Sequence, residues 1–280
     1  MPSTNVSAIF IENASIQSVF LQREVKVDFY LPMNIPDPSQ MSLLLINDGQ
    51  DMEKAGLQKT LEQLYTDGNL KPLLCVGIHA GEERRMEYAV ASKTDYKGRG
   101  AKAGLYTSFV IEELIPYIKE TYRVSSFKEK AFAGFSLGGL SALDIVWNYA
   151  DEFSKVGVFS GSFWWRSVDQ SDKDYDDDKH RIMQQQIRNG EYRPGLKFFF
   201  QCGNMDETKD RNQNGIIDSI DDTLDVIKEL EAKGYENARL NDSFGQGKDI
   251  YYLELKDGRH DIETWGRALP VFLKWGWSKG

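Results

Sequence analysis

The spacing of apolar residues changes after about the first forty positions of the chain. Near the start, SVFLQ and EVKVDFYLP alternate apolar and polar residues on either side of a turn-like Arg23, which is typical of an antiparallel hairpin. From Met41 onward the apolar residues form solid runs of four to six, which is typical of strands buried on both faces of a parallel sheet. These runs lie in SLLLIND, PLLCVGI, KAFAGFS, KVGVFSG, LKFFFQCG and DIYYLELKDG.

Helical patterns separate these runs, over residues 56–67, 106–121, 139–149, 221–233 and 262–275. Because strands and helices alternate, the pattern predicts βαβ units with right-handed crossovers. The expected fold is therefore α/β, with a mostly parallel central sheet, an antiparallel N-terminal hairpin and helices on both faces. No Pro-, Gly- or Ser-rich linker divides the chain, so we expect one domain over residues 1–280, with an irregular acidic insert at about 166–194.

Composition and charge exclude several classes of partner. With 280 residues, 41% of them hydrophobic, the chain can bury a large core without disulfide or metal staples. A net charge of −9 argues against a nucleic-acid partner. No apolar run approaches the ~18 residues that cross a bilayer, so no membrane partner is expected. Cys75 and Cys202 each end an apolar run, which indicates buried strand thiols rather than a disulfide.

The N-terminal residues hold no basic segment followed by an apolar stretch, so they do not have the pattern of a secretory signal. We therefore expect a cytoplasmic protein as numbered, or a periplasmic or secreted one if a leader has been removed. The sequence says nothing about the oligomeric state.

The strongest local signal is Gly134-Phe135-Ser136-Leu137-Gly138, which follows the apolar run KAFA and precedes a helical stretch. This strand, tight turn and helix are the setting of a nucleophile elbow, in which glycines allow the turn and the serine hydroxyl is exposed at the carboxyl end of the sheet. The alternative is a Gly-rich strand-to-helix turn whose serine only caps the helix.

A serine nucleophile needs a base within hydrogen-bond reach and a third group to orient that base. The chain has three histidines. His79 precedes the serine and His180 lies in the acidic insert, whereas His260 follows a strand and precedes the last helical stretch. The order serine, acid, histidine therefore favours His260 as the base.

The acid and the oxyanion donors are expected at the ends of other strands. KFFFQCGNMDE places Asp206 directly after a strand, with Glu207 as the alternative acid. The two oxyanion donors are expected to be the backbone N–H groups of Leu137, after the nucleophile, and of Gln50, in the loop after the first central strand.

Over nearly its whole length the sequence resembles the esterase D and enterochelin-esterase-like branch of the α/β-hydrolases, which includes feruloyl esterase domains and the mycolyltransferases. The resemblance is carried by REVKVDFYLP, NDGQD, RRMEY, FVIEELIPYIKETYRV, FAGFSLGGLSAL, FSGSFWW, CGNMDE and RHDIETWGRALPVFLKW. It implies the α/β-hydrolase fold, the triad Ser136, Asp206 and His260, and the oxyanion donors Gln50 and Leu137. Family sites also place polar and aromatic groups near the serine, where Arg85, Glu87, Trp164 and Trp165 fall here. A Trp pair after a strand can equally be packing.

A calcium loop is the one feature outside the usual family pattern. Residues 210–221 place oxygen-bearing groups at the positions of an EF-hand-type loop closed by Asp, as in dockerins. The ligands would be Asp210, Asn212, Asn214, Ile216 through its carbonyl, Asp218 and Asp221. The alternative is an Asn-Gly turn followed by a capped helix.

The sequence therefore predicts a serine carboxylesterase that forms an acyl-enzyme intermediate and uses no organic cofactor. The resemblance suggests esters on carbohydrate (acetyl or feruloyl) or siderophore esters as small-molecule substrates. One alternative is an acyltransferase that uses the same triad. A second is a non-catalytic carbohydrate-binding domain with the same fold, which the complete order of serine, acid and histidine argues against.

Overall fold

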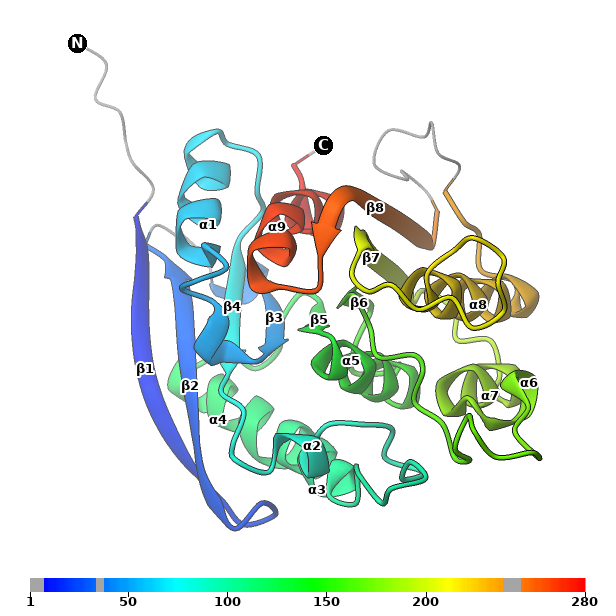
Figure 1. The fold of residues 1–280 in the computed structure, drawn as a ribbon. Coiled ribbons are helices and arrows are strands. Elements are labelled where there is room, and N and C mark those ends of the chain that lie inside the picture. The colour runs from blue at the N-terminus through cyan, green and yellow to red at the C-terminus, as the bar shows by residue number, and fades with distance from the viewer. Residues whose placement is uncertain (1–7, 34–37, 239–247, 280) are drawn as a thin grey trace.

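The computed structural model describes residues 8–33, 38–238 and 248–279, which form an eight-stranded sheet in the order β1-β2-β4-β3-β5-β6-β7-β8 (Figure 1). Strands β1 (Ile9–Ser18) and β2 (Arg23–Pro32) form the antiparallel hairpin, and β2 also pairs antiparallel with β4 (Leu73–Ile78). The other strands run parallel to β4: β3 (Ser42–Asn47), β5 (Lys130–Phe135), β6 (Lys155–Phe159), β7 (Lys197–Met205) and β8 (Ile250–Arg259). The predicted fold class is confirmed.

The position of the hairpin turn was predicted wrongly. Ser18 ends β1 and pairs with Arg23 at the start of β2, so the turn consists of residues 19–22 rather than lying at Arg23. Val19 is 81% exposed and Gln22 takes a φ of 52°, which suits a tight turn better than the strand expected from the apolar letters of SVFLQ.

Helices cover both faces of the sheet. They are α1 (Leu57–Thr66), α2 (Arg84–Glu87), α3 (Ala103–Ser108), α4 (Ile115–Thr121), α5 (Leu137–Asn148), α6 (Asp177–His180), α7 (Ile182–Asn189), α8 (Asp218–Lys233) and α9 (Ile262–Trp277). A π-helical segment, Phe109–Leu114, joins α3 to α4, and 3₁₀ turns occupy Pro38–Gln40 and Gly49–Asp51. Within the described ranges, no helix is long and apolar enough to cross a membrane.

The solid apolar runs divide between two cores because successive side chains of a strand point to opposite faces. In β3, Leu43 and Leu45 join the core beneath α5, α7 and α8, whereas Leu44 and Ile46 join the core beneath α1 and α9. Figure 1 shows α1 and α9 together on one side of the sheet and the longer set of helices on the other. Both cysteines are buried and free, as expected.

The segment at 166–194 is more regular than predicted. It contains α6 and α7, and an isolated bridge between Arg166 and Arg181 closes its first half. Arg181 is 5% exposed, and its guanidinium forms ion pairs with Asp222 and Asp225 of α8. The acidic composition of the segment alone does not reveal these contacts with a distant helix. The division of the chain into domains remains a prediction.

Candidate active site

Ser136 occupies a sharp turn between β5 and α5, with φ 53° and ψ −120°. The turn depends on its glycines: a Cβ on Gly134 would lie 2.2 Å from the carbonyl oxygen of Gly138, and one on Gly139 would lie 2.9 Å from that of Gly134. The strained backbone holds Ser136 half-buried at the carboxyl end of β5, where its hydroxyl faces a cavity.

His260 reaches the serine from the other end of the chain. Its Nε2 lies 2.9 Å from Oγ of Ser136, and its ring packs edge-to-face on Trp265 at 5.2 Å between ring centres. Asp261 caps α9 by accepting a hydrogen bond from the Thr264 N–H at 2.8 Å, which fixes the turn that carries the histidine. Partial burial of the imidazole lowers the pKa of His260, while the charge of Asp206 acts in the opposite direction.

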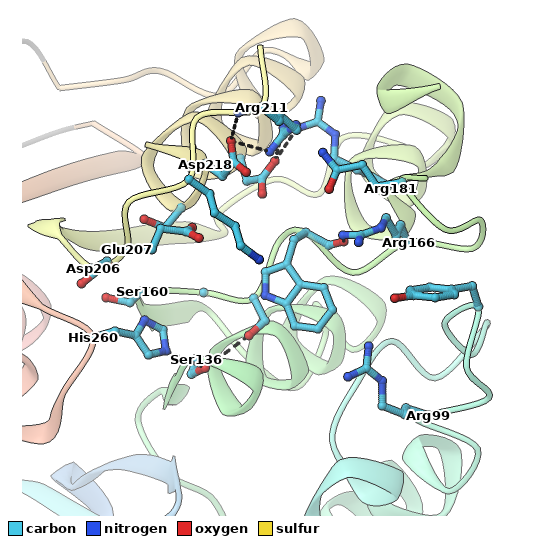
Figure 2. Close-up of a pocket in the computed structure, with 18 of the residues that line it drawn as sticks. Arg99, Ser136, Ser160, Arg166, Arg181, Asp206, Glu207, Arg211, Asp218 and His260 are labelled. Carbon is cyan, nitrogen blue, oxygen red and sulfur yellow. Dashed lines mark hydrogen bonds and ion pairs between the residues drawn. The ribbon is translucent and has the colours of Figure 1, made fainter. Parts of the chain in front are cut away.

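Asp206 follows β7, beside His260 (Figure 2). Its Oδ2 accepts a hydrogen bond from the Gly203 N–H at 3.2 Å, and its Oδ1 is buried without a hydrogen-bond partner in the described part of the chain. Burial raises the pKa of Asp206, whereas the Ser160 side chain and, to a smaller extent, the charge of His260 lower it. Asp206 and His260 therefore interact electrostatically, and the buried Oδ1 of Asp206 can still accept a hydrogen bond from an N–H group.

Glu207, the alternative acid, faces a different environment. It lines the same cavity, but its pKa is raised by burial and by the charge of Asp218, and lowered by the backbone N–H of Ser219. His260 is not among the groups that perturb Glu207. This difference favours Asp206 as the partner of His260.

The two predicted oxyanion donors lie just after β3 and β5, which are paired in the sheet. Leu137 is the first residue of α5, where helix N–H groups have no intrahelical partner, and Gln50 lies in the 3₁₀ turn after β3. Gly49 has no room for a side chain, because a Cβ there would lie 2.4 Å from the Gly77 carbonyl carbon. The Asn47 side-chain amide donates to the Gly138 carbonyl at 2.8 Å and so ties the β3 loop to the serine turn.

Sequence reasoning missed the ion pair that holds this loop. Asp48 is 3% exposed, has a φ of 60°, and accepts hydrogen bonds from Nε and Nη2 of Arg84 at 2.6 and 2.7 Å. A positive φ is unfavourable for a residue other than glycine, and the bidentate ion pair with Arg84 stabilises Asp48 in this conformation. The letters NDGQD and RRMEY contain both residues, but nothing local indicates that they pair.

The cavity beside Ser136 has a volume of about 530 Å³. Besides Ser136, Asp206 and His260, its lining includes Tyr96, Arg99, Trp164, Arg166, Tyr175 and Lys209. Figure 2 shows Arg99 and Arg166 on the side of the cavity opposite His260 and Asp206. A second group, Arg181 and Arg211, is neutralised by Asp177, Asp218, Asp222 and Asp225.

Arg166 is the basic residue that the sequence analysis overlooked. Its guanidinium carbon lies 5.4 Å from the ring centre of Tyr96 and 5.9 Å from those of Trp164 and Tyr175. Its Nε is buried without a hydrogen-bond partner, its Nη1 donates to the Trp164 carbonyl at 3.3 Å, and it forms no ion pair with a described residue. The pKa of Asp169 is lowered mainly by the Ser171 N–H and hydroxyl and only slightly by Arg166. Arg166 thus presents a guanidinium, held among aromatic rings, to the cavity.

Of the four residues predicted to bind substrate, Trp164 lines the cavity and the other three do not. Trp165, its neighbour, points into the core and is fully buried. Glu87 is 1% exposed and forms a bidentate ion pair with Arg23 of β2 at 2.6 and 2.8 Å, so its carboxylate is occupied. Arg85 is exposed on α2. The role of these residues in binding remains a prediction.

The predicted calcium loop precedes and begins α8. Asp210 accepts hydrogen bonds from the backbone N–H groups of Asn214 and Gly215 at 3.1 and 2.9 Å, and the Asn212 and Asn214 amides donate to Asp221 at 2.6 and 3.0 Å. Asp218 accepts from the Arg211 N–H at 2.8 Å. Among the described residues, no three His, Cys, Asp or Glu side chains converge as a metal site.

Comparison with known proteins shows similarity over most of the chain. The chain is 25% identical over 224 residues to "Uncharacterized protein YbbA" of Bacillus subtilis, covering 78% of this chain and 82% of that protein. Among solved structures, the enterobactin esterase FES from Shigella flexneri superposes with a TM-score of 0.70 at 19% identity, covering 96% of this chain but only 59% of that one. A ferulic acid esterase superposes with a TM-score of 0.66 at 18% identity, covering 95% and 97%. These structures share the α/β-hydrolase-type fold.

The family model described as "Putative esterase" matches residues 18–275. This range contains the serine turn, the loop that carries Asp206 and the turn that carries His260. The chain therefore belongs to this esterase family and is an ester-hydrolysing enzyme.

Proposed function

We propose that the protein is a serine carboxylic-ester hydrolase that works through an acyl-enzyme intermediate. The observation that carries the proposal is the 2.9 Å contact between His260 Nε2 and Ser136 Oγ in a strained strand-to-helix turn. A neutral imidazole at that distance can accept the hydroxyl proton as the oxygen attacks an ester carbonyl. The lowered pKa of His260 favours the neutral form that this step requires.

The remaining steps use the neighbouring groups. Asp206 acts as the acceptor for the second N–H of His260 during the reaction, which fixes the tautomer and stabilises the imidazolium. Its buried Oδ1 has no hydrogen-bond partner among the described residues and so supports this role. The N–H groups of Leu137 and Gln50 stabilise the oxyanion, each donor contributing about 3 to 4 kcal/mol to the barrier reduction. His260 then gives its proton to the leaving alcohol, and a water molecule, deprotonated by His260, releases the acid from Ser136.

The lining of the cavity favours one class among the esters suggested by the sequence. An acetyl group would fill little of a volume of about 530 Å³, whereas a planar aromatic acid would lie against the aromatic and guanidinium groups around Arg166. The printed names of two structural neighbours, a ferulic acid esterase and an enterobactin esterase in the presence of 2,3-dihydroxy-N-benzoyl-serine, also concern molecules that carry an aromatic ring. We infer that the substrate is an ester with an aromatic or anionic group next to the scissile bond.

The test is hydrolysis of a panel of esters by the purified protein, covering methyl ferulate, enterobactin, acetylated xylan and p-nitrophenyl acetate, compared as kcat/KM. A burst of p-nitrophenol at one equivalent per Ser136, followed by slower turnover, is expected if deacylation limits the rate. Preference for acetylated xylan over both aromatic esters would contradict the inferred substrate class.

We also propose that the loop at 210–221 binds Ca²⁺ through the six ligands predicted from its spacing. The backbone turn around Asp210 supports this proposal, since its carboxylate already gathers the loop. For binding, the Asn212 and Asn214 side chains must turn their amide oxygens toward the ion and release the Asp221 carboxylate. An ion held there would stiffen the segment that follows Asp206.

A further inference from the structure

A second large cavity lies at the opposite end of the parallel strands from Ser136. Its volume is about 680 Å³, and its lining includes the first residues of β3, β6 and β7 as well as the end of α9. Ser136, in contrast, follows the last residue of β5. The proposed ester hydrolysis therefore makes no use of this cavity.

Positive charge is concentrated around it. In the part of the chain that the structure describes, six lysines line the cavity: Lys71, Lys128, Lys155, Lys197, Lys248 and Lys274. Among the described residues of the lining, Glu129 is the one acidic residue. The whole chain carries a net charge of −9, so a local excess of ammonium groups around one cavity is not expected from its composition.

Few of these charges are neutralised. Lys155, 8% exposed, forms an ion pair with Glu129, and Lys248 pairs with Glu236. The remaining four, Lys71, Lys128, Lys197 and Lys274, form no ion pair with a described residue. Lys274 lies in the last turn of α9, but a helix C-terminus supplies only about half a negative charge.

The ammonium groups are close enough to affect one another. Lys155 and Lys197 are directly paired in the register of β6 and β7. Burial lowers the pKa of Lys155, Glu129 opposes this effect, and the charges of Lys197 and Lys71 lower it further. Like charges that converge on one cavity destabilise it unless an anion is present.

We propose that this cavity, the basic cavity, is a binding site for a small polyanion with two or more phosphate or carboxylate groups. Several lysines around one cavity can contact separate anionic groups, and its volume exceeds what a single phosphate would fill. The Ser42 and Ser154 hydroxyls and the Gln40 side chain in the lining can complete the contacts.

The test is isothermal titration calorimetry with sodium pyrophosphate and, separately, sodium citrate, at constant ionic strength. Calcium is removed from the protein beforehand with a chelating resin, so that its release from the loop at 210–221 contributes no heat. We expect one saturable site. A higher affinity for pyrophosphate would indicate that the natural ligand carries phosphate groups, and a higher affinity for citrate would indicate carboxylate groups. Lys197→Gln and Lys274→Gln should each weaken the affinity about tenfold, as expected for loss of one charge-assisted contact.

Two control variants make the result specific. Lys59→Gln removes an exposed lysine of α1, and Arg166→Gln removes an arginine of the cavity beside Ser136. Both control variants should bind pyrophosphate and citrate with the same affinity as the unchanged protein. Circular dichroism should show that the lysine variants fold, since each removes a like-charge repulsion. Absence of saturable binding of both anions, or equal weakening by Lys59→Gln or Arg166→Gln, would overturn the proposal.

Discussion

His260 Nε2 and Ser136 Oγ lie 2.9 Å apart although 124 residues separate them in the chain. The contact arises because β5 and β8 run in the same direction in one sheet, so the loops after them meet at its carboxyl edge. Asp206 joins from the loop after β7, the strand between β6 and β8. Parallel strands thus bring three distant segments to one place.

The assignment of the acid is tested by Asp206→Asn with Glu207→Gln as the matched variant. Asparagine keeps the shape of the side chain but cannot stabilise the imidazolium, so kcat should fall about 10³- to 10⁴-fold. Glu207→Gln should change kcat by less than about tenfold, because Glu207 interacts with Asp218 and Ser219 rather than with His260. The reverse order of the two losses would make Glu207 the triad acid.

The pH dependence of kcat/KM reports the protonation of His260 in the free enzyme. Burial lowers the pKa of His260, and activity needs the neutral ring, so the acidic limb should lie below the ordinary histidine value of about 6.5. The charge of Asp206 raises the pKa of His260. In Asp206→Asn this effect is lost, so the acidic limb of the remaining activity should move to still lower pH. A limb above pH about 7.5, or a shift upward in the variant, would contradict this electrostatic arrangement.

The role of Arg166 in substrate binding is tested with two p-nitrophenyl esters of similar size, the anionic hemisuccinate and the neutral butyrate. Arg166→Gln removes the guanidinium, so kcat/KM for the hemisuccinate should fall about 10- to 100-fold while that for the butyrate changes by less than about threefold. Arg85→Gln is the comparison, because Arg85 was predicted from sequence but does not line the cavity. Equal effects on both esters would show that Arg166 is not the anion-binding group.

Local sequence was enough to locate the serine turn. Gly134 and Gly138 leave no space for side chains, and the strand and helix on either side have clear periodicities, so the motif is visible without tertiary information. His260 and Asp206 could be placed by chain order, since each follows an apolar strand. These inferences rest on the pattern of residues around each position and on the order of the motifs along the chain.

The substrate side could not be predicted in the same way. Trp164 and Trp165 are neighbours in sequence, yet one lines the cavity and the other fills the core. Glu87 is a charged residue of a short helix, and only its contact with Arg23, on a distant strand, makes it a buried partner. Arg166 stands out only because rings from three segments surround it.

Calcium binding is tested by thermal unfolding of metal-stripped protein. Ca²⁺ should raise the Tm of the unchanged protein, and EDTA should reverse the shift. At a Ca²⁺ concentration one hundred times the Kd, the free energy of unfolding should increase by about 3 kcal/mol. Asp221→Asn should reduce the response, while Asp151→Asn, an exposed residue outside the loop, should leave it unchanged. If Ca²⁺ and EDTA both leave the Tm of the unchanged protein unaltered, the loop binds no calcium.

The most direct test of the account is to trap the covalent intermediate on the nucleophile. Intact-mass and peptide mass spectrometry after a fluorophosphonate, and after rapid acid quench with p-nitrophenyl acetate, should show a single adduct on Ser136. Ser136→Ala should show no adduct and lose at least about 10³-fold in kcat while keeping the fold. An adduct on another residue, or an alanine variant with undiminished ester hydrolysis, would contradict the central claim that Ser136 is the nucleophile.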